Sequence, residues 1–322
     1  MYDEVMDCLI NADGYVSGQE LAKKLGVSRQ AVWKAVNSLR ADGFEIESVS
    51  NRGYRLRSLP DSLNSAAVKA ELKTAVIGRE LEILDSVGST NDYLKNLGAG
   101  GCRGGYAVAA REQFGGKGRL GRTWESSRDK NLAFSVLLRP KIAPYEASAI
   151  TPLAGLAVCK ALRSFTGLDC KIKWPNDIIV GRKKLVGILT EMSAEFDAVE
   201  YIVIGIGVNV NQGEFPEEIA EKATSLLLET GERTDINKLL ARLLEQLETE
   251  FINENLELSR NALAEYSSLC ATLGREVEFT RGGRRLSGAA SAVNALGELV
   301  VNLPDNTELT VNAGEVTAQG IY

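Results

Sequence analysis

The sequence of 322 residues is 44% hydrophobic and 25% charged, with a formal net charge of −6 and a pI of about 5.1. This composition is typical of a globular protein with two or three domains, and its acidity excludes nucleic-acid binding through overall charge alone. No apolar run is long enough to span a bilayer and no signal peptide is evident, so we expect a cytoplasmic protein without a membrane partner.

Two residue types narrow the chemistry further. The five cysteines are scattered and form no CxxC pair, which argues against a disulfide framework or a zinc site. The sequence has no histidine, which excludes Ser-His-Asp and Cys-His mechanisms and histidine-ligated metals. Proton transfer must then use carboxylates, lysine or water. Nucleotidyl transfer fits this inventory, because it needs charge stabilisation more than proton shuttling.

The N-terminal block predicts a helix-turn-helix followed by a strand pair. Residues 21–39 have the apolar spacing of two short helices around a turn at Gly26. Ser17 and Ser28 are predicted N-caps, the first within a capping box. Alternating apolar residues and a turn at residues 51–54 predict the strands.

The same block is locally basic. Residues 21–57 hold eight Lys or Arg and three acidic residues, a local charge of +5. We therefore predict DNA contacts from a recognition helix and a wing, whose side chains suit base edges and phosphates. The predicted DNA-binding residues are Ser28, Arg29, Gln30, Trp33, Lys34, Arg52 and Arg55. A helical module that binds another protein is the alternative.

A polar linker at residues 60–64 leads to a second block of mixed strands and helices. Thr151 as N-cap, followed by Pro152 at the first helical position, predicts a helix start. The apolar spacing of residues 235–253 predicts an amphipathic helix. The expected strands are 106–110, 132–138, 178–180, 186–191 and 201–204. The last block, from residue 269, has short alternating strands between glycine turns, which predicts a small β-barrel.

Residues 115–124, with the sequence GGKGRLGRTW, form the most informative segment. Four glycines allow the backbone to approach a ligand, and three cations between them can neutralise a phosphate. Trp124 offers a flat face to a purine. The segment matches neither the GxxxxGK[ST] nor the GxGxxG pattern. Its alternative interpretation is a flexible loop with solvated charges.

Three more clusters have chemistry-bearing residues. Residues 88–92 (GSTND) form a polar turn that opens a helix, although plain N-capping would explain it. Residues 173–177 (KWPND) place a proline where a strand begins, and a tight turn with an aromatic anchor is the alternative. Residues 183–189 (KKLVGIL) place two lysines before a strand, where both could simply be solvated.

Together these clusters resemble the biotin protein ligases. The segments GSTND, GKGRLGRTW, KWPND and KLVGIL, and the strand-turn at residues 205–209, follow the family's order over roughly residues 83–211. The N-terminal block resembles the bifunctional members, which also repress biotin genes. The resemblance implies an α+β fold. Its parts are an N-terminal winged helix-turn-helix (1–60), a central class II synthetase-like mixed sheet with helices (61–268) and a C-terminal SH3-like β-barrel (269–322).

The resemblance also implies the reaction. Biotin and ATP are the substrates and give biotinyl-5′-AMP, from which biotin is transferred to a lysine of a biotin carboxyl carrier protein. That carrier is a subunit of acetyl-CoA carboxylase or of another biotin-dependent enzyme. Biotinyl-AMP would also be the corepressor, with the adenylate-bound protein acting as a homodimer on the operator DNA of biotin genes.

The family's site residues carry over by position. The implied biotin contacts are Ser89, Thr90, Asn91, Gln113, Lys117, Gly118, Arg119 and Lys184, of which Lys184 and Arg119 are the catalytic residues. The implied nucleotide contacts are Arg119, Arg122, Trp124, Asn176 and Asn209. Mg²⁺ is expected mainly on the nucleotide phosphates, with Asp177 as a candidate ligand. The family's loop usually has arginine where this chain has Lys117, which keeps the charge but loses the bidentate fork and leaves the role of this position open.

Two other functions compete with this interpretation. A lipoate protein ligase would share the central fold, but those enzymes have a glycine-rich motif with a histidine, which this chain lacks. A repressor that senses biotin without ligase activity would not need both Arg119 and Lys184.

Overall fold

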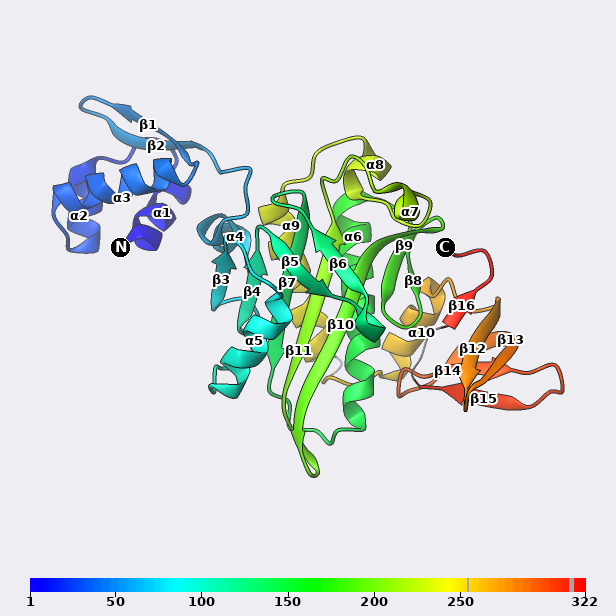
Figure 1. Cartoon of the computed structure of the whole chain (residues 1–322). Helices are drawn as coiled ribbons and strands as arrows, with labels where there is room; N and C mark the ends of the chain where they lie inside the picture. The colour runs from blue at the N-terminus through cyan, green and yellow to red at the C-terminus, as the bar shows by residue number, and fades with distance from the viewer. Residues whose placement is uncertain (254, 313–315) are drawn as a thin grey trace. The chain divides into compact units, whose positions relative to one another are not determined.

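The computed structural model describes residues 1–253, 255–312 and 316–322 (Figure 1). The chain divides into two compact units, which are described separately. One contains Met1–Leu72 with Asp235–Ala241, and the other contains Lys73–Thr234 with Arg242–Tyr322. Among the described residues, no helix has the length and apolar character needed to cross a membrane.

The first unit is a winged helix-turn-helix. Its elements are α1 (Tyr2–Ile10), α2 (Gly18–Leu25), α3 (Arg29–Ala41), β1 (Glu45–Val49), β2 (Gly53–Ser58) and α4 (Ser65–Glu71). The predicted caps are present: Ser17 and Glu20 form a reciprocal capping box, and Ser28 accepts the Ala31 N–H at 3.1 Å. Buried apolar residues of all three first helices and of β1 form its core, including Val5, Leu21, Val36, Leu39 and Ile46.

The second unit is built on a seven-stranded sheet in the order β3-β4-β7-β11-β10-β9-β8. Its strands are β3 (Leu81–Leu84), β4 (Ala107–Ala110), β7 (Asn131–Leu138), β8 (Cys170–Lys173), β9 (Asp177–Val180), β10 (Lys183–Glu195) and β11 (Ala198–Asn209). Only β3 and β4 pair in parallel, so the sheet is mixed. Strand β7 is buried along its whole length, as a central strand covered on both faces must be.

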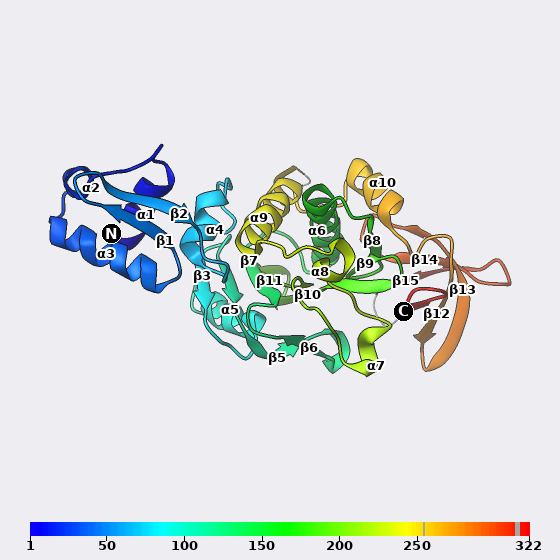
Figure 2. The ribbon, with the colours of Figure 1, turned by 90° about the horizontal axis from the view of Figure 1, so that it is seen from above.

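Helices and a hairpin cover the two faces of this sheet (Figure 2). Helices α6 (Ile150–Thr166) and α10 (Arg260–Leu269) lie on one face, whereas α5 (Thr90–Ala99) and the hairpin of β5 (Gln113–Lys117) and β6 (Thr123–Ser126) lie on the other. The remaining elements are η1 (Arg119–Gly121), η2 (Glu146–Ala149), α7 (Glu217–Ala220), α8 (Leu226–Thr230) and α9 (Ile236–Asn253).

The C-terminal part of this unit is a five-stranded antiparallel sheet in the order β15-β14-β13-β12-β16. Its strands are β12 (Glu276–Arg281), β13 (Arg284–Val293), β14 (Leu299–Asn302), β15 (Glu308–Val311) and β16 (Val316–Ala318). The predicted α+β class, with its three successive folds, is thereby confirmed. The predicted domain boundaries at residues 60 and 268 stay predictions.

Two local expectations were wrong. Helix α6 begins at Ile150 without a threonine cap, because η2 runs directly into it and the Ile150 N–H already bonds the Ala147 carbonyl. Thr151 instead donates to the Thr190 hydroxyl at 2.8 Å. Residues 205–209 form no turn, because they continue β11 paired with both neighbouring strands.

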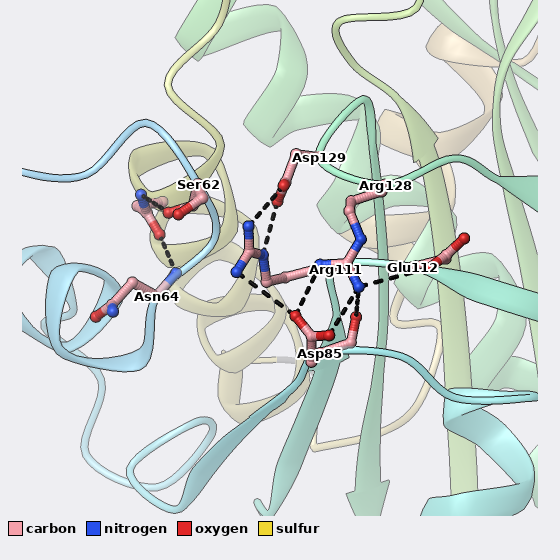
Figure 3. Close-up of polar contacts among 8 residues, drawn as sticks. Ser62, Asn64, Asp85, Arg111, Glu112, Arg128 and Asp129 are labelled. Atoms are coloured by element: carbon pink, nitrogen blue, oxygen red, sulfur yellow. Dashed lines mark hydrogen bonds and ion pairs between the residues drawn. The ribbon is translucent and has the colours of Figure 1, made fainter. Parts of the chain in front are cut away.

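The linker before α4 is held by one buried amide. The Asn237 side chain, 1% exposed, accepts the Asn64 N–H at 2.8 Å and donates to the Ser62 carbonyl at 3.1 Å (Figure 3). It also donates to the Pro60 carbonyl at 3.1 Å. All four residues belong to the first unit. The amide thus satisfies three backbone groups that would otherwise lack partners.

We expect Asn237→Ala to lower the free energy of unfolding by about 1–3 kcal/mol, because it leaves these linker groups without their partner. Urea unfolding followed by circular dichroism measures this change. Asn261→Ala, at an exposed position of α10, is the matched control and should change the free energy by less than about 0.5 kcal/mol. Equal effects of the two substitutions would contradict the prediction.

Candidate active site and DNA-binding surface

One cavity of about 650 Å³ lies on the face of the central sheet that carries α5 and the β5–β6 hairpin. Side chains from α5, the hairpin, the β8–β9 connection, β10 and β11 line it. Every residue that the sequence predicted for biotin, nucleotide or magnesium lines this cavity: Ser89, Thr90, Asn91, Gln113, Lys117, Gly118, Arg119, Arg122, Trp124, Asn176, Asp177, Lys184 and Asn209. Residues up to 120 positions apart in the sequence therefore share one site.

A buried polar network forms the end of the cavity next to α5. Ser89 caps α5, and the Gln113 side-chain oxygen accepts the Thr90 N–H at 2.9 Å. The Ser135 hydroxyl contacts the Thr90 hydroxyl at 2.8 Å and the Asn91 side-chain oxygen at 2.6 Å. Such a network fixes each hydroxyl and amide in one orientation, which suits a small polar ligand that needs several directed hydrogen bonds.

Sequence reasoning missed Ser135 and Glu191. Ser135 is fully buried in the otherwise apolar β7, and a lone hydroxyl in such a strand is a usable signal. Glu191 accepts from the Asn91 amide at 2.8 Å and pairs with Lys95 at 2.6 Å. No feature of the linear sequence indicated that contact, because Asn91 and Glu191 are brought together only by the packing of α5 on β10.

Two glycines of β11 leave room for side chains of other elements to pack directly on the backbone of the sheet. A Cβ atom on Gly207 would lie 2.3 Å from the Trp124 ring, and one on Gly205 would lie 2.1 Å from the Asn91 oxygen. Both positions therefore exclude larger residues. Trp124 rests on the backbone of β11, and its buried ring nitrogen has no hydrogen-bond partner among the described residues.

Two cations that line the cavity contact acidic or amide groups beside them. The Lys184 ammonium lies 2.7 Å from Asp177 and 5.5 Å from the centre of the Trp124 ring. Arg119 donates to the Asn176 side-chain oxygen at 3.2 Å. Asn209, although it lines the cavity, donates to the Thr224 carbonyl at 3.0 Å and so supports the cavity wall.

The basic segment is an ordered hairpin. Its strands β5 and β6 pair around η1, where Leu120 has a φ of 57°. Lys117 at the end of β5 pairs with Asp92 of α5 at 2.6 Å, and this contact, with a second one from Lys95, holds the pKa of Asp92 below its usual value. In the structure, Lys117 is thus directed toward α5.

Charged residues hold the base of this hairpin (Figure 3). Arg111, just before β5, binds both oxygens of Asp129 at 3.0 and 2.7 Å, and Arg128, just after β6, binds both oxygens of Asp85 at 2.7 Å. Paired, bidentate arginine–carboxylate contacts fix geometry better than single contacts. The hairpin therefore leaves the sheet from a fixed base.

The first unit presents the predicted DNA-binding residues on its surface. Ser28, Arg29, Gln30, Trp33 and Lys34 are all exposed at the start of α3. On the wing, the guanidinium groups of Arg52 and Arg55 lie 4.4 and 5.9 Å from the centre of the Tyr15 ring. Sequence reasoning missed Tyr15, which contacts Arg52 of the β1–β2 turn and Arg55 of β2 through cation–π interactions.

Comparisons with known proteins agree with a ligand cavity in the second unit and a DNA-binding surface on the first. Residues 83–209 match the Biotin/lipoate A/B protein ligase family, residues 3–55 match an HTH domain and residues 272–317 match the biotin protein ligase C-terminal domain. The chain is similar to the bifunctional ligase/repressor BirA of Bacillus subtilis, with 41% identity over 223 residues that cover 69% of each protein.

Two further proteins support the same assignment. The chain is 32% identical to a biotin–acetyl-CoA-carboxylase ligase of Mycobacterium tuberculosis over 80% of this chain and 97% of that protein. Its structure is similar to that of the biotin protein ligase from Aquifex aeolicus in complex with biotin and ATP, with a TM-score of 0.64 and 30% identity over 75% of this chain and 99% of the other. The chain therefore belongs to the biotin protein ligase family, among its bifunctional ligase/repressor members.

Proposed function

We propose that this chain joins biotin to ATP, transfers the biotinyl group to a lysine of a carrier protein and represses biotin genes in response to biotin. The observation that carries the enzymatic part is a single cavity that contains a buried polar network around Thr90 and Gln113 and the cation Lys184 beside the Trp124 indole. The polar network can hydrogen-bond the ureido group of biotin, and the cation and indole can bind the phosphates and adenine of a nucleotide. The names of the related proteins point the same way.

In the first step, a carboxylate oxygen of biotin attacks the α-phosphorus of ATP, and the bond from that phosphorus to the bridging oxygen breaks. Biotinyl-5′-AMP and pyrophosphate result. Both reactants are anions, so their electrostatic repulsion adds to the activation free energy. Lys184 of β10 and Arg119 of η1 both line the cavity, and their charges reduce that repulsion. Trp124, which rests on Gly207, would cover the adenine.

In the second step, the amine of a carrier lysine attacks the carbonyl carbon of the mixed anhydride. The carbon–oxygen bond to AMP breaks, AMP leaves with both bonding electrons, and the amine loses a proton to give the amide. The partner is accordingly a biotin carboxyl carrier protein of acetyl-CoA carboxylase or of another biotin-dependent enzyme. We place the reaction in the cytoplasm.

Biotin binding would require Lys117 to change partners. It faces Asp92 in the structure, although its position in the loop implies a contact to the biotin carboxylate. Both side chains are partly exposed, at 52% and 38%, so their ion pair is weak and a buried ligand anion can displace it. The hairpin would then close over the ligand with Gly118 and Arg119 against the carboxylate and phosphate.

Magnesium would arrive with the triphosphate. No group of three potential metal-ligating side chains gathers anywhere in the described part of the chain. Asp177, the predicted ligand, directs its oxygens at Lys184 and Tyr322. These residues do not form a metal cage, and no step here is assigned to a protein-bound metal.

The repressor function combines both units. A single winged helix contacts few base pairs, so tight binding is expected from a homodimer on a two-fold operator. Phe114 and Leu120 of the hairpin are 77% and 70% exposed and could contribute apolar contacts once the hairpin closes. Biotinyl-AMP would then be the corepressor, because it would favour the dimer over the monomer.

We expect Lys184→Ala to reduce adenylate formation by about 100- to 1,000-fold, because the anions then meet without their nearest screening charge. Pyrophosphate release from ATP and biotin in a single turnover measures this, with lipoate as a control acid. Lys183→Ala is the matched control, since the exposed Lys183 donates to the Ala220 carbonyl. Near wild-type synthesis by Lys184→Ala would refute the assignment.

We expect Asp92→Asn to make the empty hairpin more sensitive to trypsin by up to about fivefold, the range for a lost exposed ion pair. Added salt should accelerate cleavage of the wild type but not of the variant. Biotin with ATP should protect both proteins, because ligand contacts replace the ion pair. Cleavage at equal rates with and without ligand would show that the hairpin does not close.

We expect biotin with ATP to shift the protein toward dimers and to raise operator affinity on the order of ten- to a hundredfold, the usual range of coupling energies. Sedimentation velocity and binding to a DNA fragment selected from a random pool measure these effects. An added carrier domain should reverse both, because it consumes the adenylate. Equal operator affinity without ligand, with biotin and ATP, and with added carrier domain would instead indicate a ligase fused to a constitutive DNA-binding domain.

A further inference from the structure

The segment that follows β16 reaches from the C-terminal sheet into the cavity. Arg182, in the turn between β9 and β10, donates to the Gly320 carbonyl at 2.8 Å and accepts the Tyr322 N–H at 3.3 Å. These two bonds hold the segment beside the starts of β9 and β10, where Asp177 and Lys184 lie. Tyr322 consequently lines the same cavity as both residues, although more than 130 positions separate it from them in the sequence.

The Tyr322 side chain makes two distinct contacts there. Its ring lies with the centre 3.5 Å from the Lys173 ammonium, a cation–π contact to a side chain that is itself 9% exposed. Its hydroxyl donates to the Oδ2 atom of Asp177. The ring therefore packs on Lys173, whereas the hydroxyl binds Asp177, the carboxylate that pairs with Lys184.

Asp177 connects this hydroxyl to Lys184. Its two oxygens have different partners, because Oδ2 accepts from Tyr322 and Oδ1 lies 2.7 Å from the Lys184 ammonium. The terminal torsion of an aspartate is broad, so a carboxylate held through one oxygen can rotate. Because Oδ2 is hydrogen-bonded to Tyr322, the carboxylate turns Oδ1 toward Lys184, and this ion pair sets the position of the ammonium.

We propose that Tyr322 is a positioning residue for the first step of the reaction: its hydroxyl orients Asp177, and Asp177 places the Lys184 ammonium between the two reacting anions. The inference rests on the proposed function of Lys184. Tyr322 touches neither reacting group in this scheme and acts only through Asp177. The C-terminal sheet thereby contributes to adenylate synthesis through one hydroxyl group.

The environment of Tyr322 suits a permanent donor. Burial, and next the neighbouring Asp177 carboxylate, raise the pKa of the Tyr322 hydroxyl above its ordinary value. The hydroxyl therefore keeps its proton at every pH at which the protein would be assayed, and the orientation of Asp177 does not depend on a titration.

The first test is Tyr322→Phe in the full chain, which keeps the ring on Lys173 and removes only the hydroxyl. We expect the single-turnover rate of biotinyl-5′-AMP synthesis to fall about tenfold, as for a lost hydrogen bond to a charged group. The affinities for biotin and ATP should stay within about twofold, so that the loss lies in the rate constant. Transfer from added biotinyl-5′-AMP to a carrier domain should be unchanged, because the anions have already been joined.

Two controls separate positioning from folding. Tyr145→Phe removes a hydroxyl from a tyrosine that is 69% exposed and outside the cavity, and it should leave every rate unchanged. Tyr322→Leu also removes the ring from Lys173, so it should lower the melting temperature, whereas Tyr322→Phe should not. A synthesis rate for Tyr322→Phe within about twofold of the wild type would overturn the inference.

A double-mutant cycle gives the second test. With Asp177→Asn already present, adding Tyr322→Phe should cause no further loss, because the group through which Tyr322 acts is gone. Additive losses would overturn the inference. If Lys184→Ala loses adenylate synthesis and Tyr322→Phe does not, only this inference is refuted. If Lys184→Ala keeps the wild-type rate of synthesis, the proposed function of Lys184 and this inference are both refuted.

Discussion

The close approach of side chains to the backbone of β11 determines the rest of the site. Asn91 and Trp124 come from different elements, yet both rest where Gly205 and Gly207 have no side chain. A methyl group at either position would occupy space already filled by the amide or the indole. The central sheet therefore serves as the floor of the cavity, and α5 and the β5–β6 hairpin can lie low enough to enclose a ligand against it.

On that floor, charge is balanced before any ligand arrives. Lys184 faces Asp177, and Lys117 faces Asp92. These carboxylates give both cations a counter-charge in the empty protein. The two pairs differ in kind. Asp177, the carboxylate partner of Lys184, is 13% exposed and also accepts a hydrogen bond from Tyr322, whereas Lys117 and Asp92 are 52% and 38% exposed. We therefore expect Lys184 to keep its partner and Lys117 to exchange its partner on ligand binding.

Local patterns made much of this structure predictable. The capping box at Ser17, the polar turn at Ser89 and the apolar run of β7 each follow from residues adjacent in sequence, and the structure has all three. The cavity could be predicted residue by residue because its motifs resemble one family. The contacts of Ser135, Glu191 and Tyr322 could not, because each depends on packing between distant elements. The glycines of β11 were assigned to a turn for the same reason: their backbone is extended, and only the side chains above them explain why they are glycines.

Because the base of the β5–β6 hairpin is fixed, the stability of the closed hairpin is distinct from the stability of the whole fold. The contacts of Arg111 and Arg128 anchor the hairpin at its base, so an opening of the hairpin would not disturb β4 or β7. Such opening is a local event with its own free energy, independent of global unfolding. A substitution that weakens closure would leave the melting temperature of the protein unchanged while shortening the time for which the intermediate stays enclosed. Amide hydrogen exchange at residues 115–123, compared with exchange in β7, would separate the two processes, and a screen for thermal stability would not detect the difference.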